Sequence, residues 1–339
     1  MKNREKGWNL GYDVFSRYRG VLMGFAMVSV LLYHAFYITP VTLVGKGFKG
    51  LGFLGVDIFI FLSALGLSLS WNRRQQSYGT YLKRRLVRVL PLYWLVTGLY
   101  GLCLRLAGQV SLKTVLWTMS TLFYWFGKPS YFNWYIPGLL FFYLLAPACT
   151  ILLTRFRYRG CLVAVLSVLV FPLFHFAEFH HLGHLVDVIG RIPVFLIGIL
   201  AGVYIGQGRK LTPIRLCLWA LLPLLIPVIP HLTKPYYLPK TLAFAFGCVA
   251  VCLLLSALAA ILPKICDRAL ELLGKCSLEI YLLNVVFVME YGRLSAFVPL
   301  GPNHYLYYAI TIPGNILLGV GLHYALEKPL GWLTAKITR

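Results

Sequence analysis

Ionisable side chains stand inside long apolar stretches of this sequence. His34 lies in VSVLLYHAFY, and Asp57 lies in GVDIFIFLS. Because an ionisable residue is costly inside a membrane-spanning segment, each is a candidate functional residue. A neutral imidazole is well suited to general-base catalysis near pH 7, so His34 could take a proton from an attacking group. The alternative is a packing histidine that is hydrogen-bonded to a neighbouring helix.

Asp57 has two interpretations, which the sequence leaves open. It either orients a histidine and fixes its tautomer, or it pairs structurally with an arginine. Both require that it faces the interior of a helix bundle, because exposure to lipid would be very costly. Glu279 and Glu290 fall in a later apolar stretch, and His323 lies near the expected cytoplasmic interface, where a structural role is favoured.

A basic run, KRRLVR at residues 83–88, opens another apolar stretch. Arg84 and Arg88 are four positions apart, and Arg85 and Arg88 are three apart, so they share one side of a helix. Guanidinium groups stay charged and bind phosphate through paired hydrogen bonds, so the run suits a phosphate group. The alternative is a positive anchor that contacts lipid headgroups.

The composition indicates an integral membrane protein. Of the 339 residues, 59% are hydrophobic and only 12% are charged, whereas a soluble domain has about 25% charged residues. The net charge is +22, but the basic residues form short clusters between apolar stretches and no soluble domain is visible to carry them. We therefore expect no nucleic-acid partner, and the membrane lipid bilayer is the partner that the composition requires.

We expect one all-α domain over residues 1–339, a membrane helix bundle of about ten transmembrane helices with both termini in the cytoplasm. A spanning helix needs about 20 mostly apolar residues. The expected cytoplasmic segments, which include 1–19 and the tail 326–339, hold 23 of the 32 Lys and Arg residues, as the positive-inside rule requires. The expected spans are 20–40, 50–71, 89–107, 134–153, 160–176, 189–206, 216–230, 241–262, 277–298 and 305–325.

The segment Thr114–Phe126 is apolar but too short for a span, so we expect a re-entrant or interfacial helix there. The linkers are too short for a second soluble domain. The loop from His175 to His184 is rich in histidine, but neither it nor the cysteines have the spacing of a zinc site. We therefore expect no metal.

Seven blocks of the sequence, in order and across nearly the whole chain, resemble the acyltransferase 3 family of integral membrane O-acyltransferases. RGVLMGFAMVSVLLYHAF resembles the family's first helix, with its catalytic histidine at His34, and GFLGVDIFIFLSA resembles its glycine-valine-aspartate block. YLKRRLVRVLPLYW resembles the family's R-x-x-R followed by proline and tyrosine, with Arg85 and Arg88 at the arginine positions. The other blocks are NWYIPGLLFFYLLAP, RIPVFLIGILAG, LGKCSLEIYLLN and HYALEKPL, the last with the family's glutamate-x-proline at Glu327.

The resemblance implies a multi-pass enzyme of the bacterial plasma membrane. Such an enzyme takes an acyl group, most commonly acetyl, from cytoplasmic acyl-CoA and delivers it to a hydroxyl of a carbohydrate or another cell-envelope acceptor. The phosphates of acyl-CoA are expected on Arg84, Arg85 and Arg88. His34 is expected to deprotonate the acceptor, while Asp57 orients a catalytic group or pairs with an arginine. The residues assigned to the substrate or to the tetrahedral oxyanion are Trp134, Tyr135, Tyr281 and Glu327.

Three positions depart from the family's pattern. Met23 stands where an arginine usually precedes the histidine by eleven residues. Arg19, one turn earlier, is about 60° from His34 around the helix and about 6 Å deeper than that arginine, and it is the candidate for the same role at the cofactor. Asn284 replaces a histidine that many members carry, and it cannot do acid–base work at neutral pH. Ala64 replaces a common glycine, which we interpret as a packing change.

Two other functions fit the same residues. One is a lipid or glycan flippase, or another transporter, that uses the polar cavity without chemistry, and independence from acyl-CoA would favour it. The other is a catalytically inactive membrane scaffold of the same fold, which Met23 and Asn284 would favour. Some relatives append a soluble esterase-like domain, which is not expected here, so a second transfer step would need a separate extracytoplasmic transferase. The acceptor, the acyl chain and the oligomeric state are not determined by the sequence.

Overall fold

The protein is helical throughout its described part. The computed structural model describes residues 11–38, 43–73, 76–210, 237–290 and 305–337. Among these residues the regular elements are all helices, and the only β-type contact is an isolated bridge between Gly11 and Lys210. The all-α class expected from the sequence is therefore confirmed.

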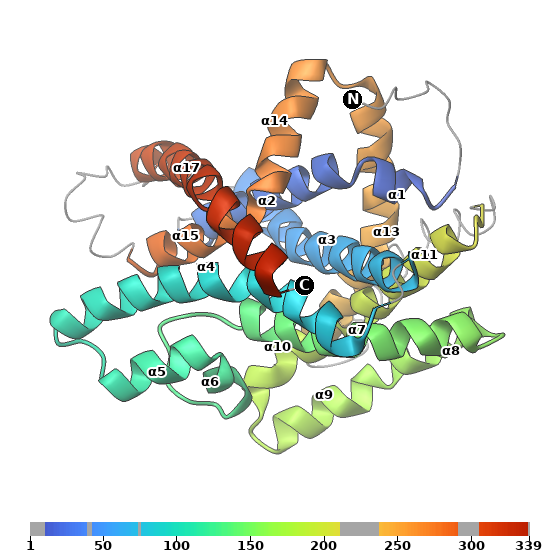
Figure 1. Ribbon diagram of the computed structural model, residues 1–339, viewed down its shortest axis with the longest axis horizontal. Coiled ribbons are helices and arrows are strands. Elements are labelled where there is room, and N and C mark those ends of the chain that lie inside the picture. Colours follow the sequence, from blue (N-terminus) through green and yellow to red (C-terminus); the bar gives the residue numbers. More distant parts are fainter. Residues whose placement is uncertain (1–10, 39–42, 74–75, 211–236, 291–304, 338–339) are drawn as a thin grey trace.

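The chain contains both long and short helices, and Figure 1 shows how they cross. In chain order the elements are α1 (Val14–Arg17), α2 (Arg19–Ile38), α3 (Leu43–Arg73), α4 (Tyr78–Leu106), α5 (Leu112–Ser120), α6 (Leu122–Trp125), α7 (Tyr135–Arg155), α8 (Arg159–Val168), α9 (Val170–Phe179), the 3-10 turn η1 (Gly183–Leu185), α10 (Val186–Ile189), α11 (Ile192–Gly206), α13 (Tyr237–Ile261), α14 (Lys264–Lys275), α15 (Ser277–Met289) and α17 (Tyr305–Ile337).

The helices are long and apolar enough for a polytopic membrane protein. Within the described ranges, six helical stretches could cross a membrane, and α14 with α15, bent by 70° at their junction, would make a seventh. The apolar helices Arg19–Ala35 and Ala245–Ile261 are shorter. The expected span 216–230 lies outside the described residues, so the count of ten spans and the orientation of the termini stay predictions.

The apolar segment Thr114–Phe126 forms two short helices rather than one span. Thr121, at a backbone φ of 64°, ends α5 and begins α6. The nine residues of α5 cover about 13.5 Å, less than half of the roughly 30 Å hydrocarbon core of a bilayer. The prediction that this segment does not span is confirmed.

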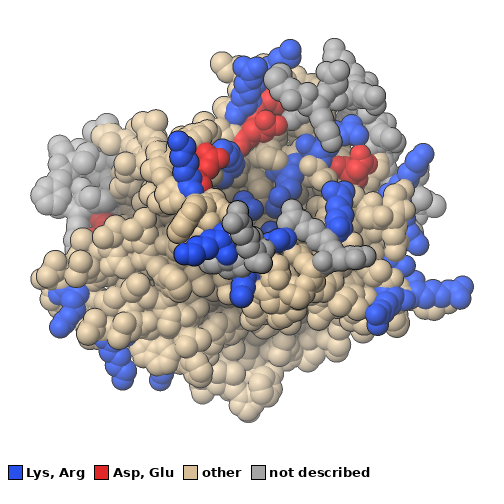
Figure 2. All heavy atoms as spheres, in the orientation of Figure 1, with Lys and Arg blue, Asp and Glu red and all other residues tan. Residues whose placement is uncertain are grey.

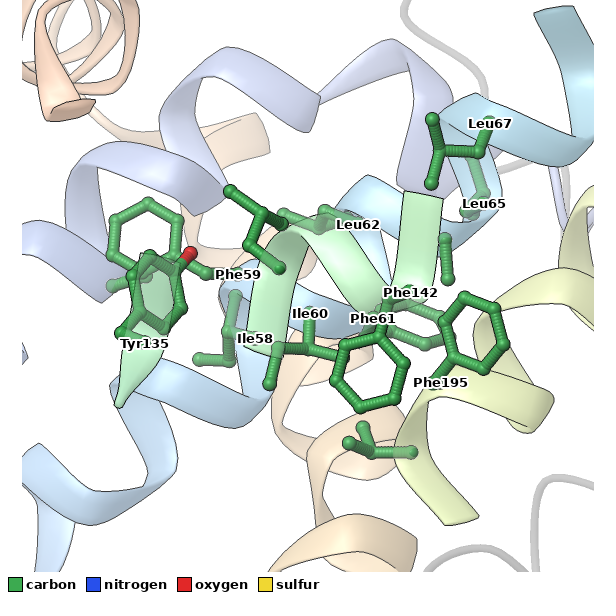
Figure 3. Close-up of a cluster of buried hydrophobic side chains, with 14 of the residues drawn as sticks. Ile58, Phe59, Ile60, Phe61, Leu62, Leu65, Leu67, Tyr135, Phe142 and Phe195 are labelled. Carbon is green, nitrogen blue, oxygen red and sulfur yellow. The ribbon is translucent and has the colours of Figure 1, made fainter. Parts of the chain in front are cut away.

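The core of the bundle surrounds α3, which contacts α2, α7, α11 and α13. The consecutive side chains from Ile58 to Leu62 are all buried, because a helix enclosed by others is apolar on every side. Figure 3 shows this cluster together with Tyr135, Phe142 and Phe195, and the rings of Phe142 and Phe195 stack with centroids 4.6 Å apart. Asp57 of α3 is therefore enclosed by protein rather than by lipid.

The start of α2 is held by a close crossing with α14, the helix that projects at the top of Figure 1. A Cβ atom added to Gly274 would lie 2.1 Å from the carbonyl oxygen of Gly20, and one added to Gly24 would lie 2.1 Å from that of Leu270. Only glycine lets the two backbones approach this closely. The crossing fixes the position of Arg19, which begins α2.

We expect Gly274→Leu to destabilise the protein, because the new side chain must push α14 away from α2. Overpacking of this kind costs about 1–3 kcal/mol or more, and it is measured as a lower midpoint of thermal unfolding in detergent. Gly321→Leu is the matched control, since nothing lies within 4 Å of a Cβ at that helical glycine. Equal midpoints for the two variants would show that the crossing is not tightly packed.

Candidate active site

Three guanidinium groups converge on one cavity of about 110 Å³ near the start of α2. Arg19 comes from α2, and Arg85 and Arg88 come from the first turns of α4. The remaining walls come from α3, α7 and α15, and no Asp or Glu of the described chain lines the cavity. We call this space the arginine cavity.

Two of the arginines, Arg19 and Arg88, have no carboxylate partner among the described residues. Arg19 Nε is also enclosed without a hydrogen-bond partner among them. Like charges held together in a partly enclosed space repel one another unless an anion binds between them. The cavity therefore has the chemistry of a site for phosphate or another anion.

Charged side chains are unevenly distributed over one face of the molecule. Figure 2 shows Lys and Arg side chains, with Asp and Glu side chains among them, gathered over the part of this face where α14 and the C-terminal end of α17 lie, whereas the part formed by α5, α6 and α9 carries fewer charges. This uneven distribution agrees with the sequence clusters that the positive-inside rule assigns to the cytoplasm.

Arg84 does not join the other three arginines at the arginine cavity. Its Nη1 donates to Oε1 of Gln76 over 3.1 Å, and it lines a neighbouring hollow with Ser70 and Arg85. Arg19, by contrast, reaches the cavity because α3 carries a glycine at the contact: a Cβ on Gly66 would lie 3.1 Å from Arg19 Nη2. The structure thus brings together Arg19, Arg85 and Arg88 from the set expected at the cofactor.

His34 lines a second, smaller cavity of about 20 Å³, formed by α2, α15 and α17. We call it the histidine cavity. Nδ1 of His34 is hydrogen-bonded to Oδ1 of Asn284 on α15. An amide oxygen can only accept, so Nδ1 carries the proton and Nε2 keeps the lone pair of the neutral ring. The arrangement presents the tautomer that a general base at Nε2 requires.

The two cavities lie along the same pair of helices. Arg19 and His34 are separated by about 22 Å along α2, from the helical rise. On α15, Tyr281 lines the arginine cavity, and Asn284, one turn further, lines the histidine cavity. Met27, which is fully buried, occupies the same side of α2 between the two levels.

Asp57 lies next to Arg191 rather than next to His34. Its Oδ1 is 3.5 Å from Arg191 Nε, and the two side chains are 1% and 2% exposed. Arg191 also lies 3.4 Å from Asp187 and stacks over the ring of Trp134, 5.1 Å from its centroid. Asp57 lines neither cavity, so of its two interpretations the described contacts favour the structural pair with an arginine.

The aromatic residues expected at an oxyanion have different surroundings. Tyr135 and Tyr281 both line the arginine cavity, with ring centroids 4.7 Å apart. The hydroxyl of Tyr281 donates to Asn133 Oδ1 over 2.7 Å, so its proton is already engaged. Trp134 faces Arg191 instead.

Glu327 lies outside both cavities. It is about half exposed, and Lys275 Nζ donates to its Oε1 over 3.2 Å. His323 pairs with Glu279, Nδ1 to Oε1 at 2.8 Å, and so joins α17 to α15. This pairing agrees with the structural role expected for His323. Among the described residues, no group of three or more His, Cys, Asp or Glu side chains converges to hold a metal ion.

The sequence reasoning missed two buried polar residues, Arg191 as the partner of Asp57 and Asn315 in the histidine cavity. Arg191 stands at the start of a strongly apolar helix, and an isolated charge at that position is the signal that could have marked it. Asn315 is a buried amide inside α17, and a single amide in an apolar stretch gives too weak a signal to stand out.

The comparison with protein families decides the identity of this fold. The Acyl_transf_3 family model, described as an acyltransferase domain, matches residues 21–323. The chain belongs to the acyltransferase 3 family. The matched range contains His34, Arg85 and Arg88, and it excludes Arg19 and Glu327. No curated protein and no solved structure shows a significant match.

Membership in the acyltransferase 3 family makes this protein a membrane acyltransferase, as the sequence resemblance implied. Met23 and Asn284 are two positions at which this sequence departs from the family's pattern, and the structure shows what lies around each. Arg19 reaches the arginine cavity beside Met23, and Asn284 contacts His34 directly.

Proposed function

We propose that the protein binds acyl-CoA from the cytoplasm and transfers the acyl group to a hydroxyl of a carbohydrate or other cell-envelope acceptor at the bacterial plasma membrane. One observation carries the proposal. The arginine cavity, which no described carboxylate lines, lies at one end of α2, and a histidine with its Nδ1 proton engaged lies about 22 Å further along the same helix.

The donor would bind with its phosphates in the arginine cavity. Arg19, Arg85 and Arg88 supply donors that stay charged at any physiological pH. The pantetheine arm, a long and flexible chain, would then follow α2 and α15 toward His34. By helical spacing, the buried Met27 lies on α2 between Arg19 and His34, and an unbranched thioether side chain can change rotamer to let the arm pass. The smallest acyl group, acetyl, is the donor group that we propose, because the histidine cavity has a volume of only about 20 Å³.

The chemical step would take place at His34. Nε2 accepts the proton of the acceptor hydroxyl while the hydroxyl oxygen attacks the carbonyl carbon of the thioester. The tetrahedral intermediate collapses as the C–S bond breaks, and the departing sulfur takes the proton from the imidazolium. The products are an O-acyl ester and CoA with a free thiol, and the histidine returns to its neutral form.

Calorimetry of acetyl-CoA binding to the purified protein in detergent tests the donor site. We expect Arg85→Ala/Arg88→Ala to weaken binding at least about 100-fold, since each hydrogen bond between charged groups contributes roughly 1.5–3 kcal/mol. The matched control removes two arginines that line neither cavity, Arg155→Ala/Arg157→Ala, and should bind as the unaltered protein does.

Two results would count against the proposal. Equal losses in both double variants would mean that overall positive charge, rather than the arginine cavity, attracts the donor. If the unaltered protein bound no acyl-CoA of any chain length, the transporter and scaffold alternatives would take precedence over acyl transfer.

A further inference from the structure

The histidine cavity contains a buried amide that the chemistry proposed above does not use. Asn315 of α17 is 1% exposed, and neither its Oδ1 nor its Nδ2 has a hydrogen-bond partner within the described part of the chain. Buried polar side chains are nearly always paired, because leaving one unsatisfied is costly. An amide with two polar atoms that no protein group engages, beside a candidate general base, can therefore bind a polar group from outside the protein.

The position of this amide is fixed by the packing of α17 against α15. Glu279 pairs with His323, and a Cβ on Gly319 would lie 2.5 Å from Cγ1 of Ile280. The two helices run in opposite directions, since contacts further along α15 fall earlier on α17. One turn beyond these contacts, Asn284 and Asn315 lie at the same level, and both line the histidine cavity.

The lining of the histidine cavity defines what it can accept. On α17, Tyr308, Thr311 and Asn315 follow one another at helical spacing on a single face. Apart from His34, the described lining residues carry no ionisable Asp, Glu, Lys or Arg side chain. The volume of about 20 Å³ exceeds the roughly 10–15 Å³ that one water needs, so it accommodates one hydroxyl group and not a sugar ring.

We propose that Asn315 is an acceptor-binding residue, whose amide holds the attacking hydroxyl of an uncharged polyol beside His34. Nδ2 of Asn315 donates a hydrogen bond to the oxygen of the attacking hydroxyl, whose single proton is left to hydrogen-bond to Nε2 of His34. Asn284 orients the imidazole from the opposite helix, so the two amides have separate tasks. This inference rests on the proposed acyl transfer and adds the residue that selects a neutral hydroxyl.

The test uses membranes that contain the full-length protein and its endogenous acceptors, supplied with acetyl-CoA labelled in the acetyl group. The label recovered as base-labile ester in the envelope fraction is compared with acetyl-CoA binding and with the unfolding midpoint of the purified protein. We expect Asn315→Leu to reduce ester formation about tenfold or more, while Asn315→Ser, which keeps one hydroxyl, falls between it and the unaltered protein. Acetyl-CoA binding stays unchanged in both.

The midpoint of thermal unfolding distinguishes an acceptor-binding role of Asn315 from a structural one. Because Asn315 has no partner in the described chain, an apolar residue of similar size should leave the midpoint unchanged or raise it. Leu317→Ala on the exposed side of α17 is the control and should transfer normally. Normal ester formation by Asn315→Leu would overturn the inference. The inference would also be overturned if both Asn315 variants had a lower midpoint and lost binding and transfer in parallel. Neither result would contradict the proposed donor site. Absence of ester formation by the unaltered protein would overturn the proposed function itself.

Discussion

His34→Gln is expected to lower acyl transfer by about 10²–10⁴-fold, the usual contribution of a general base. Glutamine is the informative replacement because its side-chain amide can still donate a hydrogen bond to Oδ1 of Asn284, as Nδ1 of His34 does. The packing between α2 and α15 is therefore retained while the basic nitrogen is lost. The measurement is the rate of labelled ester formation from acetyl-CoA at saturating donor.

The control for His34→Gln is the binding of acetyl-CoA to the same variant. Acetyl-CoA binding should remain normal, because His34 lines a different cavity from Arg19, Arg85 and Arg88. A variant that binds donor normally but does not transfer assigns a chemical role to the histidine. Transfer at more than about a tenth of the normal rate would reject the general base and favour the packing interpretation of His34.

Removal of Arg191 is expected to have the largest effect on stability. Its charge pairs with Asp57 where both side chains are inaccessible to solvent, and breaking a buried ion pair costs about 3–5 kcal/mol. Arg191→Leu leaves Asp57 buried without a cation. Asp57→Leu should cost less, because Arg191 keeps a second carboxylate, that of Asp187, at 3.4 Å. The double variant should recover part of the loss, since neither charge is then left alone.

Thermal unfolding of the four proteins in detergent forms a double-mutant cycle that measures the coupling between Asp57 and Arg191. The same proteins separate the two interpretations of Asp57. If Asp57 is structural, transfer per folded molecule changes little in Asp57→Leu. A loss of transfer of about 100-fold or more at an unchanged midpoint would instead show that Asp57 acts on a catalytic group.

The sequence by itself determined the class of the protein and several of its candidate site residues. Its long apolar stretches indicate a membrane-embedded helical chain, because a helix satisfies its backbone hydrogen bonds within one segment and needs about 20 apolar residues to span a bilayer. His34 and Asp57 were found because an ionisable residue stands out in an apolar stretch. Arg85 and Arg88 were found because a helix places residues three or four positions apart on one side.

Only the tertiary structure decided which of these residues meet. Helical periodicity assigns a residue to one side of its own helix, but it gives neither the neighbouring helix nor the register between the two. Arg19 joins the arginine cavity because glycines allow α2 to approach α14 and α3 closely, whereas Arg84 turns to Gln76. Asp57 pairs with Arg191, from a helix more than a hundred residues later. These pairings depend on long-range backbone contacts, and no local pattern in the sequence encodes them.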